Sequence, residues 1–403
     1  MTETVFAAGD VAWVLTACAL VLMMTVPGLA LFYGGMVRRT NVLSTLMQAL
    51  TAAVLVTLAW VIAGYSIAFG GEGALFGGFS KLGLSGVGLD SASGALPETV
   101  FILFQLTFAI ITVAIIAGAA AERLNFAAWV VFVPVWLLLV YAPIAHWVWG
   151  GGFLHAAGVL DFAGGAVVHI NSGVAGLVLA LKLGPRRGWP REGQPPHNLV
   201  LTVIGAGLLW VGWFGFNGGS ALGAGALAGH AALVTQIAAA AAALTWAGLE
   251  WGIKGKASVL GAASGAVAGL VGVTPAAGFV EPYGALLIGV LTAAAAFVAV
   301  GWFKRWFGYD DSLDAFGLHG IGGLAGAILT GVFASSAIGG TGGLVEGNIG
   351  LVWTQTWGAL AAAGYCAVAT FLILWVMERF MSLRVDPEDE ITGLDVALHG
   401  ESA

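Results

Sequence analysis

Long apolar stretches that are almost free of charge recur along the whole chain, and each is long enough to cross a membrane as a helix. A soluble domain of this size could not hide the apolar surface of a chain that is 59% hydrophobic and 9% charged. A transmembrane barrel is excluded, because its strands alternate apolar and polar residues at every second position. We therefore predict an all-α polytopic membrane protein with eleven transmembrane helices. The apolar runs are 11–36, 42–69, 98–120, 125–148, 162–182, 198–219, 227–251, 257–275, 281–303, 313–334 and 350–380.

The positions of Lys and Arg predict how the chain crosses the membrane. If the N-terminus is outside, every Lys and Arg except Lys81 falls on the cytoplasmic side, and adding or dropping a span would scramble this asymmetry. We therefore predict an N-out, C-in topology. The acidic start, MTETVFAAGD, lacks the positive region of a cleaved secretory signal, so we expect the first apolar run to be a permanent span.

The chain changes character near residue 383. Residues 1–382 are predicted to form the transmembrane domain, and 383–403 form a polar, acidic cytoplasmic tail. A charge run of this kind is usually a solvated segment, and the alternative is a docking or coupling element.

The same polar pair occurs twice within the apolar runs, as Asp161 followed by His169 and as Asp311 followed by His319. Ionisable groups inside membrane spans are costly and mark functional positions. The predicted topology makes the two segments run in opposite directions, and each His lies about 12 Å deeper than its Asp. In a hydrocarbon core of roughly 30 Å, the two His then come within about 6 Å of the same depth.

A second repeated motif supports internal symmetry. The motif FYGG at 32–35 ends the first span, and FNGG at 216–219 ends the sixth. We predict inverted 5+5 repeats, over about 10–182 and 198–334, with the span at 350–380 outside the repeat. Such repeats place a substrate site at their interface, near the middle of the membrane.

The polar pair suggests a pathway rather than a metal site. A lone buried His is usually a satisfied core residue, but His169 and His319 at one depth can share a hydrogen bond and still face a small polar solute. A metal would need a third ligand that neither span supplies, and HExxH is absent, so no metal and no cofactor are predicted. Asp161 and Asp311 can cap helix starts, Asp161 can also attract a cation from outside, and Asp314 can pair with a cytoplasmic Lys or Arg.

Aromatic residues near the outer face form a candidate cation site. Phe104 and Phe108 are four residues apart and share a helix face. Together with Trp149 and the hydroxyl of Ser220, they can bind a small cation through ring faces and one acceptor. Each ring taken alone would be an ordinary interfacial residue. A basic patch with interleaved aromatics is absent, so no nucleic-acid partner is expected.

Five segments closely resemble the Amt/Mep/Rh ammonium transporters, on the bacterial Amt side, and the resemblance runs from about residue 10 to the tail. These segments are YAPIAHWVWGGG (141–152), DFAGGAVVHINSGVAGL (161–177), WFGFNGGSA (213–221), DSLDAFGLHGIGG (311–323) and GLDVALHGE (393–401).

The resemblance implies a transporter rather than an enzyme. It implies a homotrimer of eleven-span subunits in the lipid of a bacterial cytoplasmic membrane, each subunit with its own pore, and ammonium or ammonia as substrate with methylammonium as an analogue. Phe108, Trp149 and Ser220 are implied to form the outer ammonium site, with Asp161 supporting it electrostatically.

Further residues are placed along the pore by the same resemblance. Phe104 and Phe216 would form a stacked phenyl gate, His169 and His319 the twin-histidine pair, and Trp213 a wall of the conduit. A bare cation crossing an apolar tube would cost several kcal/mol or more, which favours passage as neutral NH3 with the proton moving separately.

The resemblance also implies that transport is regulated from the cytoplasmic side. The tail, with Gly393 and Asp395, resembles the family segment that helps a PII-family regulator dock, and Asp311 and Asp314 lie on the same side. Three alternatives stay open at this point: a gas or water channel of the Rh type, a sensor that reports ammonium through the tail, and an intramembrane metalloenzyme. The missing third ligand argues against the metalloenzyme.

Overall fold

The structure is a computed structural model that describes residues 6–403; residues 1–5, part of the acidic start discussed above, lie outside it. Over this range the elements are helices joined by loops, apart from one short hairpin of β1 (Ala92–Ser93) with β2 (Leu96–Pro97). Ten of the described helices are long and apolar enough to cross a membrane. The all-helical, membrane-embedded class is therefore confirmed.

The elements follow the predicted runs closely. In the first half the helices are α1 (Ala8–Met23), α2 (Ala30–Met36), α3 (Val42–Ala59), α4 (Tyr65–Phe69), α5 (Glu98–Ala120), α6 (Phe126–Trp136), α7 (Ala142–Trp149), α8 (Phe153–Ala156) and α9 (Asn171–Leu183). In the second half they are α10 (Leu199–Trp213), α11 (Ala226–Lys254), α12 (Val259–Val273), α13 (Pro282–Val298), α14 (Lys304–Trp306), α15 (Gly322–Phe333), α16 (Ser336–Gly339), α17 (Ile349–Met377), α18 (Pro387–Thr392) and α19 (Leu394–His399).

One predicted span is shorter than the rest. The apolar run at 257–275 forms α12, whose 15 helical residues are followed by a turn. At 1.5 Å per residue this helix is about 22 Å long, less than the hydrocarbon thickness of a typical bilayer.

Several of the long helices contain π-helical turns. Three of these turns replace α-helix at Gly165–Ile170, Phe214–Gly218 and Phe316–Ile321. The first contains His169, the second Phe216 and the third His319. Single-turn π segments inside α-helices are rare and are frequent at functional sites.

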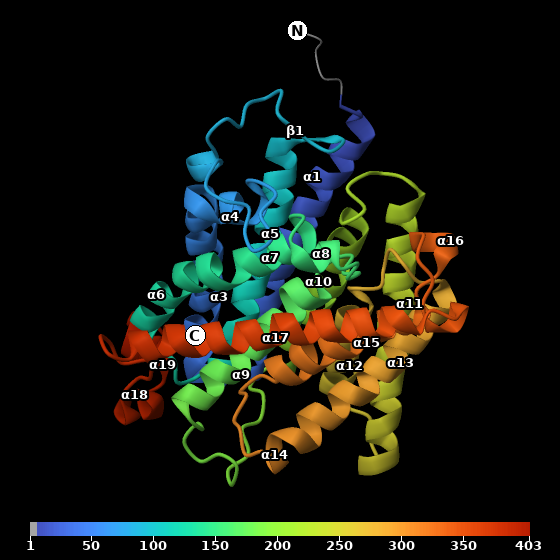
Figure 1. Cartoon of the computed structure of the whole chain (residues 1–403). Coiled ribbons are helices and arrows are strands. Elements are labelled where there is room, and N and C mark those ends of the chain that lie inside the picture. Colours follow the sequence, from blue (N-terminus) through green and yellow to red (C-terminus); the bar gives the residue numbers. More distant parts are fainter. Residues whose placement is uncertain (1–5) are drawn as a thin grey trace.

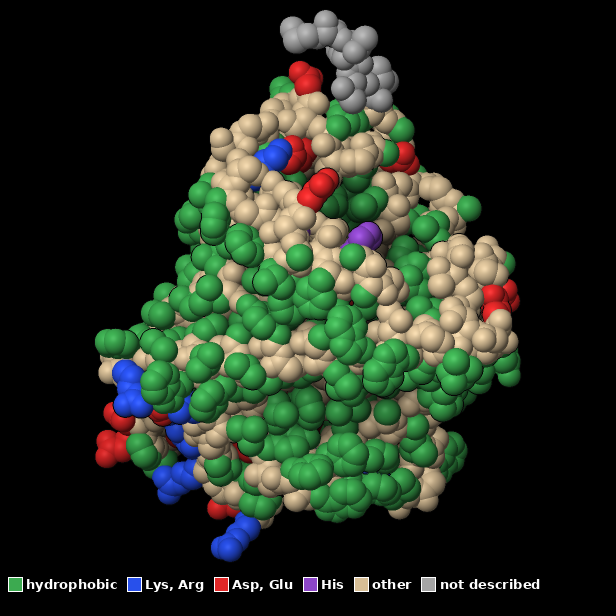
Figure 2. Space-filling view, in the orientation of Figure 1, with side chains coloured by type: hydrophobic (Ala, Val, Ile, Leu, Met, Phe, Trp, Pro, Cys, Tyr) green, Lys and Arg blue, Asp and Glu red, His purple; other side chains and the backbone are tan. Residues whose placement is uncertain are grey.

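The core is built around α5, where almost every residue is buried. This helix packs against α1, α3 and α9 (Figure 1). It therefore connects the first helices of the chain with α9, the last helix of the first half. The long helix α17 crosses the bundle over α9 and α15 (Figure 1). On the face shown in Figure 2, apolar side chains cover the middle, and Lys and Arg gather at the end that carries α18.

At that end, Glu122 holds three segments together. Its Oε1 accepts from the backbone N–H of Arg38 at 2.6 Å and from the side chain of Asn41 at 3.1 Å, while Oε2 lies 3.3 Å from Arg186. Burial alone would raise the pKa of this carboxyl. The charge of Arg186, together with the contacts from Arg38 and Asn41, outweighs burial and holds the pKa below its ordinary value of 4.5.

We expect Glu122→Gln to destabilise the protein by about 3 kcal/mol, because it leaves the buried guanidinium of Arg186 with Asp310 as its one remaining carboxylate partner among residues 6–403. A lowered pKa gives stability that is complete above the ordinary value and is lost as pH falls toward the folded value. Thermal unfolding in detergent should therefore show wild type losing stability below about pH 4.5, with a shallower loss in the variant. Glu388→Gln, at an exposed tail residue, is the control. Equal pH profiles for wild type and Glu122→Gln would contradict this account.

Candidate functional site: an aromatic pocket and a buried histidine pair

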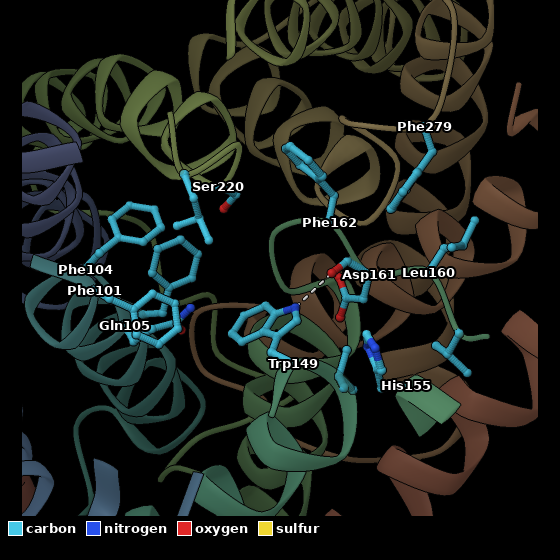
Figure 3. A pocket seen from close by; sticks show the side chains of 14 residues that line it. Phe101, Phe104, Gln105, Trp149, His155, Leu160, Asp161, Phe162, Ser220 and Phe279 are labelled. Carbon is cyan, nitrogen blue, oxygen red and sulfur yellow. Dashed lines mark hydrogen bonds between the residues drawn. The ribbon is translucent and has the colours of Figure 1, made fainter. Parts of the chain in front are cut away.

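A pocket of about 290 Å³ is lined by aromatic rings together with a few polar side chains (Figure 3). It brings together five of the predicted outer-site and gate residues, which come from four separate segments of the chain. These five residues are Phe104, Phe108, Trp149, Asp161 and Ser220.

Hydrogen bonds decide which polar atoms in this pocket can bind a solute. The hydroxyl of Ser220 donates to the carbonyl oxygen of Phe216 at 2.8 Å, so its own oxygen remains free to accept. The indole N–H of Trp149 donates to the carbonyl oxygen of Asp161 at 2.8 Å, which fixes the ring in the wall (Figure 3). Ser220 therefore offers an acceptor, and Trp149 offers a ring face.

The carboxylate of Asp161 is committed to the backbone. Its two oxygens accept from the N–H groups of Gly164, Gly165, Ala166 and Val167 at 2.5–3.2 Å, at the start of the helix that carries His169. This is helix capping, in which a negative charge meets the positive end of the helix dipole. Asp161 thus positions the helix, and any effect on a cation acts through its charge rather than through direct contact.

The stacked pair of phenyl rings is Phe108 with Phe216, whose ring centroids lie 4.2 Å apart at 28°. Phe104 meets Phe108 edge-on at 4.8 Å, so the predicted stack of Phe104 on Phe216 is wrong. That assignment came from the family resemblance, and residue spacing alone does not show which of the two α5 rings reaches Phe216, a residue of a π-helical turn. Phe108 also meets Trp149 edge-on at 5.8 Å, so it belongs to both the pocket and the stack.

His169 and His319 meet directly below this stack. Their Nδ1 atoms lie 3.2 Å apart and their ring centroids 5.2 Å apart. Because a hydrogen bond needs one donor and one acceptor, one imidazole carries its proton on Nδ1 while the other accepts. Both rings are buried, and the Nε2 of His169 has no protein partner within residues 6–403.

Neighbouring rings hold the histidines in a continuous column. His169 lies parallel to Trp213 at 5.4 Å and to Phe216 at 5.9 Å. The indole N–H of Trp213 donates to Thr274 Oγ1 at 2.9 Å, which fixes this wall. The sequence of contacts therefore runs from Trp149 and Phe108 through Phe216 to the histidine pair.

Each histidine is followed four residues later by a glycine that packs against the other histidine's helix. A Cβ added to Gly173 would lie 2.5 Å from Gly320 Cα and 3.1 Å from the carbonyl carbon of His319. A Cβ added to Gly323 would lie 3.0 Å from both the Gly165 carbonyl oxygen and the His169 Cβ. These reciprocal contacts let the two backbones approach closely enough for the imidazoles to touch.

The segment that precedes His319 is fixed by buried polar contacts. Arg123 donates to the carbonyl oxygen of Asp310 at 2.6 Å and to Ser312 Oγ at 2.5 Å. Asp310 also accepts two hydrogen bonds from the Arg186 guanidinium, each 2.9 Å. Asp311 then caps the helix by accepting from Ala315 at 3.0 Å and Phe316 at 2.7 Å, as Asp161 does in the other half.

The remaining predicted residues lie outside the column. Asp314 forms an ion pair with Lys304 at 2.9 Å, at the end of the bundle that carries the tail. Asp395 accepts from the backbone N–H of Ser44 at 2.8 Å, and Gly393, at φ 99°, packs against Thr40. The tail is therefore bound to the start of α3.

No group of three or more His, Cys, Asp or Glu side chains that could hold a metal ion occurs within residues 6–403. The residue that sequence reasoning missed is Gln105, which lines the pocket beside Phe104. A signal for it was present, because it is a lone amide within the apolar run at 98–120. Phe162 and Phe279, which also line the pocket, carried no such signal.

Fold and site together define a polytopic helical membrane protein in which a column of aromatic rings leads from a surface pocket to two touching histidines. Such an arrangement suits a passage for a small solute. The chain belongs to the Ammonium Transporter Family, whose pattern it matches over residues 12–403.

Individual relatives in sequence and in structure support this family membership. An "Ammonium transporter" of Bacillus subtilis is 49% identical over 390 residues, covering 96% of each chain. Among solved structures, Mep2 of Candida albicans has a TM-score of 0.89 at 35% identity, covering 95% of this chain and 88% of its own. A "Sensor Amt Protein" has a TM-score of 0.90 at 28% identity, covering 97% and 98%.

Proposed function

We propose that this protein transports ammonium, taking the cation at the aromatic pocket and passing NH3 along the ring column to the histidine pair. The observation that carries the proposal is the continuous contact from Trp149 through Phe108 and Phe216 to His169 and His319. Membership of the family and the named activity of its relatives support the substrate.

The pocket has the groups that a small cation needs. The faces of Phe108 and Trp149 attract positive charge, and the free oxygen of Ser220 accepts an N–H. These contacts replace part of the hydration shell at the mouth of the passage. The committed carboxylate of Asp161 adds a negative potential there without binding the ion.

Beyond the stack of Phe108 on Phe216, the passage is walled by aromatic rings, and a charged solute would lose most of its solvation. Loss of a proton before this point removes that cost. The imidazole pair then offers NH3 a donor and an acceptor inside an otherwise apolar stretch. We propose that the proton crosses by a separate route, which gives net ammonium uptake.

The wider organisation is proposed on the same basis. Asp161 and Asp311 cap their helices alike, and Gly173 and Gly323 pack reciprocally, as inverted repeats require. We propose an eleven-span subunit in which α12 is the short eighth span, N-out and C-in, working as a homotrimer in a bacterial cytoplasmic membrane. The docked tail, with Asp395 bound at the start of α3, is the proposed contact for a PII-family regulator.

Purified protein in solid-supported membranes tests this function directly. We expect ammonium and methylammonium pulses to give transient currents that saturate with concentration, while potassium pulses give none. The physical reason is that potassium has no proton to lose and would have to pass the ring column as a bare ion. A potassium current as large as the ammonium current would overturn the proposal.

A sensor is the second candidate, because a sensor protein shares this fold at a TM-score of 0.90. In a sensor, ammonium would bind at the pocket without sustained flux. Saturable ammonium binding in the absence of any transport current or methylammonium uptake would favour this function over transport.

A further inference from the structure

We infer that Gln105 is a substrate-binding residue of the outer pocket, and that its carboxamide oxygen accepts an N–H from ammonium there. The inference rests on the proposed function and adds a ligand to the same site. Gln105 lies on α5 and lines the pocket together with Phe104, Phe108 and Trp149. Figure 3 shows it on the α5 side of the pocket, beside Phe101 and Phe104 and across from Trp149.

The amide of Gln105 differs from the other polar groups in the pocket wall because its oxygen is buried and, in the described part of the chain, unpaired. Gln105 is 8% exposed, and its Oε1 has no hydrogen-bond partner among residues 6–403. Buried amide oxygens in proteins are nearly always paired, so an unpaired one on a residue that lines a pocket marks a group that a ligand's N–H can satisfy once the amide turns toward it.

The other polar groups of the pocket leave this role open. Asp161 is saturated by four backbone N–H groups, and the indole N–H of Trp149 is tied to a carbonyl. Only Ser220 among the predicted ligands keeps a free acceptor. Ammonium has four N–H donors, and the rings can satisfy them only weakly, so a second strong acceptor improves its binding.

The amide is free to turn toward the cation. The last torsion of a glutamine side chain is broad and roughly two-fold, so a half-turn exchanges the carboxamide oxygen and nitrogen. Since Oε1 has no protein partner to give up, the turn breaks no hydrogen bond to it. Gln105 can therefore present oxygen to an ammonium ion without moving the helix.

Gln105→Leu removes the acceptor and keeps the approximate volume, and initial transport currents measured against ammonium concentration test the result. We expect the KM for ammonium to rise about tenfold, as for loss of one hydrogen bond to a charged group, with the maximal current unchanged. Gln105→Glu restores an acceptor and should keep the KM within threefold of wild type or lower it. Gln105→Met provides a second apolar replacement if the leucine variant does not fold.

Gln48→Leu is the matched control. Gln48 is also buried on a membrane helix with an unpaired Oε1, but it does not line the pocket. The KM of the Gln48→Leu variant should therefore equal that of wild type. A wild-type KM in both apolar Gln105 variants would overturn the inference. An equal rise in the leucine and glutamate variants, or in Gln48→Leu, would overturn it too. Absence of any saturable ammonium current in wild type would instead refute the proposed function.

Discussion

Gly173→Ala is expected to lower ammonium transport by about tenfold or more and to destabilise the protein by about 1–3 kcal/mol. The new Cβ would lie 2.5 Å from Gly320 Cα, and this neighbour is backbone that cannot rotate away. The helix carrying His319 must therefore move, and the 3.2 Å contact between the two Nδ1 atoms lengthens or breaks. Initial transport currents and thermal unfolding in detergent measure the two effects separately.

A matched glycine shows whether the effect belongs to the site. Gly364 lies exposed on α17, and a Cβ built there meets nothing within 4 Å. Alanine at this position should leave transport unchanged and should slightly stabilise the helix, since glycine costs roughly 0.5–1 kcal/mol relative to alanine. Wild-type transport and wild-type stability in Gly173→Ala would contradict the close helix contact described here.

His169→Ala is expected to abolish both the ammonium current and methylammonium uptake. The change removes the ring that packs against Trp213, Phe216 and His319, together with the Nδ1 atom that lies 3.2 Å from His319 Nδ1. NH3 would then cross this stretch without a hydrogen bond, and each lost bond to a buried polar group costs about 1–3 kcal/mol. Current and uptake are both needed, because one reports charge and the other reports the solute.

His230→Gln serves as its control, since the Nε2 of this half-buried ring donates to the carbonyl oxygen of Val280 at 2.8 Å, outside the column, and glutamine can replace that donor. Its current and uptake should match those of wild type. If His169→Ala keeps both signals at wild-type level, the histidine pair has no part in the mechanism.

The membrane spans could be predicted well because their determinant is local. An apolar run of sufficient length forms a helix in lipid wherever it occurs, since every backbone group must be paired within the segment. α12 is the exception, because its run at 257–275 includes residues that form a turn after Val273. The ends of runs depend on packing, which sequence spacing does not carry.

The site was less predictable, because ring directions depend on backbone detail. Depth matching correctly brought His169 and His319 together, and the resemblance placed Phe108, Trp149 and Ser220 at one pocket. The stack was assigned to Phe104 through the family resemblance, whereas the ring that stacks on Phe216 is Phe108, one turn farther along α5. The importance of an unpaired amide is visible only once its neighbours have been found.

The π-helical turns make the alignment of the ring column depend on the number of residues in each turn. A π turn holds one residue more than the α-helical turn it replaces, and each residue rotates an α-helix by about 100°. His169, Phe216 and His319 each lie in such a turn. Deleting one residue from a turn would leave every ring present and every span apolar, yet it would rotate the ring against the rest of its helix and out of the column. The alignment of the ring column is therefore encoded in the residue count of three short segments as much as in the side chains they carry.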